Sequence, residues 1–172
     1  MRRLMLLRHA KATRSPEFAD YDRPLDLRGK KGAMLLGRYL ASSHLFPESV
    51  LVSPSARTRE TWDIIKDHVA KIEPHFDDEL YHASAGVILS HIRNTAGHVK
   101  CLMVIGHNPG FADIAEELAG SGDCFALANM RTKFPTSGLA VMDFNIADWR
   151  LVRCSEGRLV QFITPKLLGI DE

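Results

Sequence analysis

An alternation of short apolar runs with helix-forming stretches is the feature that most constrains the fold of this chain. The runs Leu4–Leu7, Val50–Val52 and Cys101–Ile105 are each followed by a polar or glycine-containing turn. Short, uninterrupted apolar runs of this kind are typical of strands buried on both faces, as the strands of parallel sheets are. We therefore expect these runs to form buried, parallel strands.

Helical periodicity fills the intervals between these runs. In four stretches, apolar residues recur every three or four positions and so share one face of a helix. The four sets are Ala33, Leu36 and Leu40; Trp62, Ile65, Val69 and Ile72; Val87, Ile88 and Ile92; and Phe111, Ile114, Ala115 and Leu118. Strands and helices in alternation predict an α/β fold.

The last third of the chain has a different pattern. Residues Gly120–Pro135 mix glycine, serine, aspartate, asparagine and lysine without a steady period, which indicates a long connection. Further runs have the composition of strands, and turns separate them. These runs are Leu139–Phe144, Trp149–Val152 and Leu159–Ile163. We expect some of them to pair antiparallel at the edge of the sheet.

Size and charge limit the classes of function. With 172 residues, of which 45% are hydrophobic, the chain can bury a sizeable core, and we expect residues 1–172 to form a single domain. The 22 Lys and Arg residues are balanced by 21 Asp and Glu residues, so no overall field favours nucleic acid or an anionic membrane. Any site for an anion must therefore be built locally.

The lack of a recognisable targeting signal and the pattern of cysteines predict a location in the cytoplasm. The apolar run after Arg2 and Arg3 is too short for a secretory signal, and no other stretch could span a bilayer. The cysteines, Cys101, Cys124 and Cys154, are odd in number and lack C-x-x-C spacing. This pattern disfavours a disulfide framework and a zinc site, so we interpret them as small core residues.

Unusual side chains follow each of the expected parallel strands. Arg8 and His9 follow the first strand, Arg57 comes shortly after the second, and His107 follows the third. Active sites of open α/β sheets form beyond the carboxyl ends of the strands. We therefore expect these two arginines and two histidines to converge on one crevice.

That combination of side chains suits a phosphoryl group. Arginine binds phosphoryl oxygens with two parallel hydrogen bonds and stays charged, while imidazole is a good nucleophile and leaving group near neutral pH. A helix that starts at Pro109 would add free backbone amides and the positive end of its dipole. No metal is then required.

Each residue also has a purely structural interpretation. An isolated Arg8–His9 pair at a strand end is more often a surface or capping pair than a catalytic one. Arg57 could belong to a solvated helical face, on which it forms weak charge pairs together with Arg59 and Glu60. His107 could simply precede a turn with an asparagine cap. The combination of these residues carries the prediction.

Ordered motifs along the chain are similar to those of one known family. Leu7-Arg8-His9-Ala10 resembles the Arg-His-Gly signature of the histidine phosphatase superfamily, with alanine in place of glycine. The other matching motifs are Arg23-Pro24-Leu25-x-x-x-Gly29, Ser53-Pro54-x-x-Arg57-x-x-x-Thr61 and Gly106-His107-Asn108. The resemblance spans most of the chain and implies a phosphoglycerate mutase-like fold, with three α/β/α layers around a mainly parallel sheet.

Within the superfamily, the chain resembles the SixA-type phosphohistidine phosphatases, which are short. Only 50 positions separate Arg57 from His107, which leaves little room for the helical lid insertion of longer members. An open site can admit a phosphorylated side chain on a folded protein, whereas metabolites usually occupy more enclosed pockets. The resemblance thus implies a phosphohistidine-bearing protein partner, such as a histidine phosphotransfer domain, and no cofactor.

The resemblance also implies roles for the site residues in a metal-independent phosphatase. His9 attacks phosphorus and carries a transient phosphoryl group, which water then removes. Arg8 and Arg57 neutralise the phosphoryl oxygens, and His107 adds a hydrogen bond or a charge. The further candidates for substrate binding are Arg23, Asn108 and Ser137, the last of which could equally just end the preceding loop.

The sequence departs from the family at the proton donor. Longer members place a glutamate two residues after a leucine, and the matching position after Leu80 holds His82. An alcohol leaving group needs a positioned acid, whereas a phosphorylated imidazole leaves as imidazole with a pKa of roughly 6.5. The missing carboxylate favours phosphoramidate substrates and leaves Glu79 and His82 as the candidate proton donors.

Two other functions stay open. A phosphomonoesterase acting on a small phosphorylated metabolite would use the same nucleophile and would differ only in its leaving group. A non-catalytic phosphoryl-binding protein could retain the same fold. The intact set of Arg8, His9, Arg57 and His107 disfavours this last function.

Overall fold

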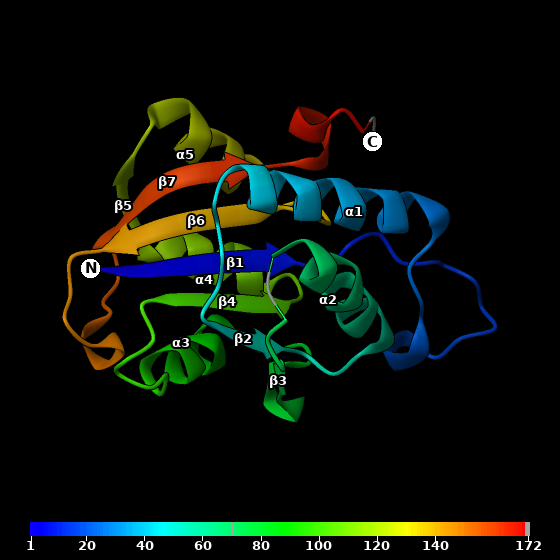
Figure 1. Cartoon of the computed structure of the whole chain (residues 1–172), viewed down its shortest axis with the longest axis horizontal. Coiled ribbons are helices and arrows are strands. Elements are labelled where there is room, and N and C mark those ends of the chain that lie inside the picture. The colour runs from blue at the N-terminus through cyan, green and yellow to red at the C-terminus, as the bar shows by residue number, and fades with distance from the viewer. Residues whose placement is uncertain (70, 171–172) are drawn as a thin grey trace.

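A computed structural model of the chain describes residues 1–69 and 71–170 (Figure 1), so the last two residues of the expected domain lie outside the described ranges. The strands are β1 (Arg2–Arg8), β2 (Ser49–Val52), β3 (His75–Phe76), β4 (Cys101–Gly106), β5 (Ala119–Gly122), β6 (Leu139–Phe144) and β7 (Gly157–Ile163). The α-helices are α1 (Leu27–Ser42), α2 (Ala56–Val69), α3 (Ala85–Arg93), α4 (Gly110–Leu118) and α5 (Cys124–Thr132). The short 3-10 helices are η1 (Asp20–Asp22), η2 (Asp78–Leu80), η3 (Trp149–Leu151) and η4 (Pro165–Leu168).

The strands form one 7-stranded sheet in the order β3-β2-β4-β1-β6-β7-β5. Strands β1, β4, β2 and β3 pair in parallel with one another. Strand β6 is antiparallel to both of its neighbours, β1 and β7, whereas β5 is parallel to β7. The predicted α/β fold with a mainly parallel sheet is confirmed. The antiparallel pairing, however, lies inside the sheet beside β1 and not at the edge.

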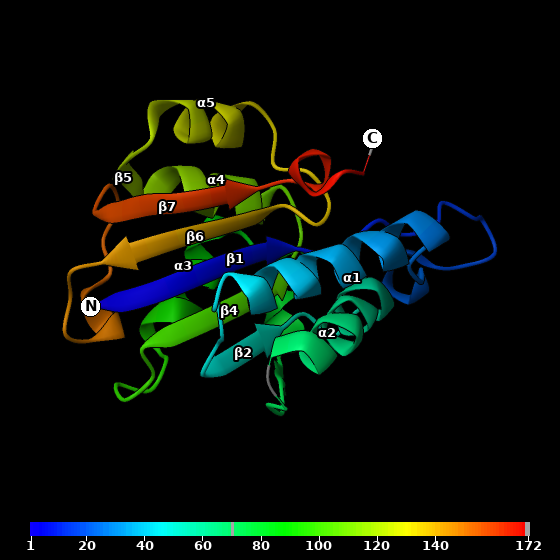
Figure 2. The same ribbon diagram turned by 45° about the horizontal axis from the view of Figure 1, so that its top comes forward.

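The apolar side chains of β1 alternate between two cores. Leu4 and Leu6 pack in a cluster with residues of α3 and α4, whereas Met5 and Leu7 pack with residues of α1 and α2. Figures 1 and 2 show these two pairs of helices on opposite faces of the sheet. Strand β1 is therefore buried on both faces, which explains its uninterrupted apolar run and confirms the three-layer arrangement. No helix in the described ranges combines the length and apolarity needed to cross a membrane.

The segment Gly120–Pro135 differs from the prediction of a long connection. It contains most of β5 and the whole of α5. The Asp123 side chain caps α5 by accepting a hydrogen bond from the backbone of Ala126. Only Met130 of this helix is buried. The sequence therefore lacks the apolar period that marks the other helices.

The predicted strand Trp149–Val152 is also wrong, because this segment forms the 3-10 helix η3. The Asp148 side chain accepts a hydrogen bond from the backbone of Arg150 and so starts the turn. Trp149 is fully buried, and its indole donates to the Val99 carbonyl at 2.7 Å. The apolar residues of this segment thus belong to a turn that covers the core, and not to a strand.

Smaller differences concern single residues. Helix α2 ends at Val69, although Ile72 still packs against the same core. Helix α4 begins at Gly110, one residue after the predicted start. Two of the cysteines, Cys124 and Cys154, are exposed, so the interpretation of all three as core residues is wrong.

Candidate active site

His9 directly follows β1, a strand that is paired on both sides. Its backbone N–H donates to the Gly106 carbonyl at 3.0 Å, which extends the pairing of β1 with β4. The side chain is only 7% exposed, and its Nδ1 lies 2.7 Å from the Ala10 carbonyl. Because a carbonyl can only accept a hydrogen bond, Nδ1 carries the proton and Nε2 presents a lone pair.

The charge state of His9 follows from its surroundings. Burial, followed by the charges of Arg57 and Arg8, lowers the pKa of His9 to about 3. The imidazole is therefore neutral at pH 7, the form in which its nitrogen is a nucleophile. The guanidinium of Arg57 approaches the lone pair directly, with Nε 3.3 Å from His9 Nε2.

Ala10 takes the place of the family's glycine without strain. Its φ is not positive, and its side chain packs in a small cluster with Leu25 and Ala33. Its backbone N–H donates to Thr61 Oγ1 at 3.0 Å. The Thr61 hydroxyl in turn donates to the Arg57 carbonyl at 2.6 Å. Thr61 thus links the segment that carries His9 to the helix that carries Arg57.

Arg57 lies in the first turn of α2 and is 2% exposed. Its Nη1 donates to the Asp20 carbonyl at 2.6 Å, and its Nη2 lies 3.1 Å from Asp20 Oδ2. Arg59 points elsewhere, with its guanidinium 4.0 Å from the centre of the Phe76 ring. The alternative in which both arginines share a solvated helical face is therefore wrong.

His107 follows β4 and faces the same space. It is 3% exposed, and burial, with smaller contributions from His9 and Arg57, lowers its pKa to about 2. Its Nδ1 lies 3.3 Å from Arg57 Nη2, which can only donate, so Nδ1 accepts. The proton is then on Nε2, 2.7 Å from Ser53 Oγ.

These side chains line one pocket of about 480 Å³. The structure gathers in it eight residues that the sequence singles out: Arg8, His9, Arg23, Arg57, His82, His107, Asn108 and Ser137. Arg8 and Asn108 both donate to the Phe134 carbonyl, at 3.0 and 2.9 Å. Ser137 fits both of its interpretations, because it lines the pocket while its N–H closes the loop against the carbonyls of Arg8 and His9.

His82 enters the pocket from a strained backbone. Its φ is 53°, in the left-handed region, which costs a residue other than glycine roughly 1–3 kcal/mol. Its ring stacks on that of His107, with centroids 5.3 Å apart and planes 21° apart. Its Nε2 lies 3.0 Å from Asp20 Oδ2.

Asp20 is the site residue that the sequence analysis missed. Its carboxylate contacts Tyr81, His82, Arg23 and Arg57. Hydrogen bonds from Tyr81, and then from the other three, hold the pKa of Asp20 well below its usual range. The available signal was its position three residues before Arg23, which allows the ion pair within one turn at 2.7 Å.

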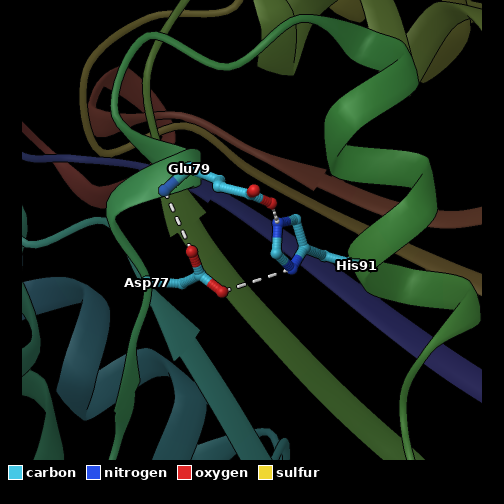
Figure 3. A group of neighbouring side chains, drawn as sticks. All are labelled: Asp77, Glu79 and His91. Atoms are coloured by element: carbon cyan, nitrogen blue, oxygen red, sulfur yellow. Dashed lines mark hydrogen bonds and ion pairs between the residues drawn. The ribbon is translucent and has the colours of Figure 1, made fainter.

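Glu79 does not reach the pocket. Figure 3 shows its carboxylate turned toward His91 of α3, with Glu79 Oε2 3.1 Å from His91 Nε2. Asp77 Oδ2 lies 3.6 Å from the other ring nitrogen of His91. Candidate ligand atoms of these three residues lie within 4.8 Å of one another. Because the carboxylates face opposite ring nitrogens, the arrangement suits a bridging imidazole better than shared ligation of a metal ion.

Comparisons with known proteins agree with this geometry. The model of the histidine phosphatase superfamily (branch 1) matches residues 4–96. The uncharacterised protein Rv1276c of Mycobacterium tuberculosis is 34% identical over 163 residues, which are 93% of this chain and 100% of that protein. A solved structure assigned as the phosphohistidine phosphatase SixA of Agrobacterium tumefaciens is 32% identical, with a TM-score of 0.81 over 95% of this chain and 98% of that one.

A further solved structure has the same fold. It is the protein histidine phosphatase SixA in complex with tungstate, with a TM-score of 0.78 and 22% identity over 96% of this chain and 99% of that one. Together, the family model and the relatives cover the strands and loops that carry Arg8, His9, Arg57 and His107. The chain therefore belongs to the histidine phosphatase superfamily, in which it is a hydrolase of the phosphatase class similar to the SixA type.

Proposed function

We propose that this protein hydrolyses a phosphohistidine on a partner protein through a transient phosphoryl group on His9. The neutral His9 carries the proposal, because its Nε2 lone pair lies 3.3 Å from Arg57 in a pocket that Arg8 and His107 also line. A neutral imidazole beside guanidinium groups can attack a phosphorus atom whose oxygens those groups bind.

The reaction has two steps. In the first, His9 Nε2 forms a bond to phosphorus while the bond from phosphorus to the substrate imidazole breaks. In the second, water attacks the phosphorus of phospho-His9, the bond to Nε2 breaks, and inorganic phosphate leaves. Arg8 and Arg57 stabilise the phosphoryl oxygens in both steps. In the described ranges Arg8 Nε is buried without a hydrogen-bond partner, which suits it to bind such an oxygen.

His107 needs to change its hydrogen bonding when the phosphoryl group binds. Its Nδ1 accepts from Arg57 in the structure, whereas a phosphoryl oxygen requires a donor. The Ser53 hydroxyl next to Nε2 can accept or donate. Ser53 therefore allows the His107 proton to reside on Nδ1, from which it can bind the substrate.

The leaving group favours phosphohistidine over an alkyl phosphate. Among the described residues that line the pocket, only Asp20 has a carboxylate. Its lowered pKa keeps this carboxylate ionised at pH 7. It cannot donate a proton, and His82, which Asp20 orients, is the remaining candidate donor. An alcohol needs such a donor far more than an imidazole with a pKa of roughly 6.5.

The surroundings of the pocket favour a protein substrate. Between Arg57 and His107, the described chain forms the rest of α2 and then β3, η2, α3 and β4, all of which belong to the sheet and its layers. No inserted lid is present in that described stretch. The pocket can therefore receive a side chain that projects from a folded partner, as expected of a protein similar to SixA.

The proposal includes metal independence. Arg8 and Arg57 can supply the positive charge that a metal ion would otherwise provide to the phosphoryl oxygens. We expect turnover to be unchanged after treatment with EDTA. Strong inhibition that added Mg²⁺ or Zn²⁺ reverses would contradict this part of the proposal.

A comparison of substrates tests the proposed reaction. The purified protein is given a protein phosphohistidine, phosphoimidazole, an aryl phosphate and glycerol phosphate, and released phosphate is measured. We expect turnover of the first two and little turnover of glycerol phosphate. Fast hydrolysis of glycerol phosphate with slow hydrolysis of phosphohistidine would assign the protein to small metabolites. No turnover of any substrate would indicate a non-catalytic phosphoryl-binding protein.

A further inference from the structure

The pocket carries more positive charge than a phosphoryl group requires. Seven basic residues line it, Arg8, Lys11, Arg14, Arg23, Arg28, Arg57 and Lys133, against the single carboxylate of Asp20 among the described lining residues. The formal net charge of the whole chain is only +1. A phosphoryl group carries about two negative charges, which Arg8, Arg57 and Arg23 can balance. Lys11, Arg14 and Arg28, which we call the basic rim, are in excess of this need.

The basic rim does not stabilise the fold in an evident way. The side chains of Lys11, Arg14 and Arg28 have no hydrogen-bond or ion-pair partner within residues 1–69 and 71–170. An anionic partner outside the chain would supply the ion pairs that these three cations lack.

Exposed apolar side chains accompany the basic rim. Phe18 and Tyr21, which are 41% and 38% exposed, lie between Arg14 and Arg23, and Leu27, which is 86% exposed, precedes Arg28. Leu167, which is 69% exposed, lies in η4 between the pocket-lining residues Pro165 and Ile170. Figure 1 shows these segments at the end of the sheet where β1 ends. Apolar and basic side chains in one region are typical of protein interfaces, whereas a small polyanion would not use the apolar ones.

We propose that the basic rim docks an acidic surface of the partner protein, next to the phosphohistidine that enters the pocket. The inference rests on the proposed function and adds the chemistry of the partner. Carboxylates that flank the phosphohistidine pair with Lys11, Arg14 and Arg28, while apolar side chains of the partner contact Leu27 and Leu167. Such charge pairs mainly raise the rate of association and make it sensitive to salt.

Matched phosphohistidine peptides test the docking surface. Two peptides of equal length carry one phosphohistidine each, flanked in one by Asp and Glu and in the other by Asn and Gln. We expect the wild type to hydrolyse the acidic peptide with a kcat/KM about tenfold or more above that of the amide peptide at low salt. Raising the salt concentration to 0.5 M should remove most of this preference, because the Debye length then falls to about 4 Å.

Charge-reversal variants locate the surface. The double variant Arg14→Glu/Arg28→Glu should lose the preference for the acidic peptide but keep the wild-type kcat for phosphoimidazole. The matched control is Arg153→Glu, because Arg153 is exposed and follows η3, close to the opposite ends of the strands. The control should keep the full preference. Thermal unfolding of each variant checks that the fold is intact.

The outcomes separate this inference from the proposed function. Equal kcat/KM values for the two peptides in the wild type, or an unchanged preference in the double variant, would overturn the docking surface. The basic rim could instead bind a second phosphoryl group of a small substrate. In that case the wild type would hydrolyse a small bisphosphate, the double variant would not, and the kcat/KM values of the double variant for the two peptides would be equal. This result would contradict the inference. Failure of the wild type to hydrolyse phosphoimidazole would reject the proposed function itself.

Discussion

The base and the mouth of the pocket are built in different ways. At the base, His9, Arg57 and His107 are 7%, 2% and 3% exposed, and each comes directly or shortly after a central strand. At the mouth, the side chains of Asp20 and His82 are 46% and 50% exposed and lie on or beside short 3-10 turns. Rigid elements hold catalytic groups more precisely than loops, whereas loops vary more readily. We infer that the base determines the reaction and the mouth determines the substrate.

The largest expected effect comes from the base. The change His9→Asn keeps a polar side chain but removes the nucleophilic nitrogen, so kcat for phosphoimidazole should fall by about 10⁴-fold or more. The same variant should show no acid-labile phosphoryl label after rapid quenching. His98→Asn is the control, because His98 is exposed and does not line the pocket. Turnover within tenfold of wild type in His9→Asn would reject the proposed nucleophile.

The second effect separates two arginines on one helix. The change Arg57→Lys removes the planar fork that reaches His9, His107 and Asp20 together, so kcat/KM should fall about 10²–10³-fold. Arg59→Lys loses a contact with Phe76 outside the pocket and should stay within about twofold of wild type. Similar losses in both variants would remove the distinction between the buried base and its surroundings.

The third effect is a pH dependence of stability. Burial lowers the pKa values of His9 and His107 to about 3 and about 2, whereas an unfolded histidine has a pKa of about 6.5. Below pH 6.5 the unfolded chain therefore binds more protons than the folded one. The free energy of unfolding should fall with pH down to about 3, by up to about 1.4 kcal/mol per pH unit for each histidine.

Urea unfolding at pH 7 and pH 5 measures this dependence. The lowered pKa of Asp20 does not interfere, because its contribution is lost only as the pH falls below the usual carboxyl value of 3.8. The His9→Asn variant should show a shallower slope than wild type, whereas His98→Asn should not. Identical slopes in wild type and His9→Asn would show that the folded protein does not hold His9 neutral.

The smallest effect belongs to the mouth. The Asp20 carboxylate forms ion pairs with Arg57 and Arg23, so an incoming oxyanion must compete with it for these two guanidinium groups. The change Asp20→Asn should therefore lower the inhibition constant of tungstate about 3–10-fold, since the Asp20 backbone carbonyl still holds Arg57. Asp22→Asn, in the same exposed turn, is the control. Weaker inhibition in Asp20→Asn would mean that the carboxylate positions Arg57 and does not compete.

The same contrast explains what could be predicted from the sequence. His9, Arg57 and His107 could be placed together because each follows a strand, and parallel strands bring their carboxyl ends to one edge. Asp20 could not be placed, because its partners Arg57 and Tyr81 are distant in sequence and its turn has no periodicity. Glu79 is close to His82 in sequence, but the turn η2 directs it to α3 instead.

Helix α5 and strand β5 could not be predicted from the sequence, for a related reason. A helix is recognised from its sequence by the apolar face that it buries, and α5 buries only Met130. The register of β5 with β7 contains an irregularity between Ala119 and Ser121, so its residues lack strand alternation. Peripheral elements that bury little apolar surface leave little pattern in the sequence.

The position of β1 in the sheet also has a consequence for folding. This strand pairs only with strands that lie far from it in sequence, because its two neighbours are β4, which begins at Cys101, and β6, which begins at Leu139. Pairing across such separations in sequence slows folding. The apolar run Leu4–Leu7 therefore stays unpaired until these distant strands reach it. The position of His9, at the end of β1, is fixed only when β4 and β6 have paired with this strand.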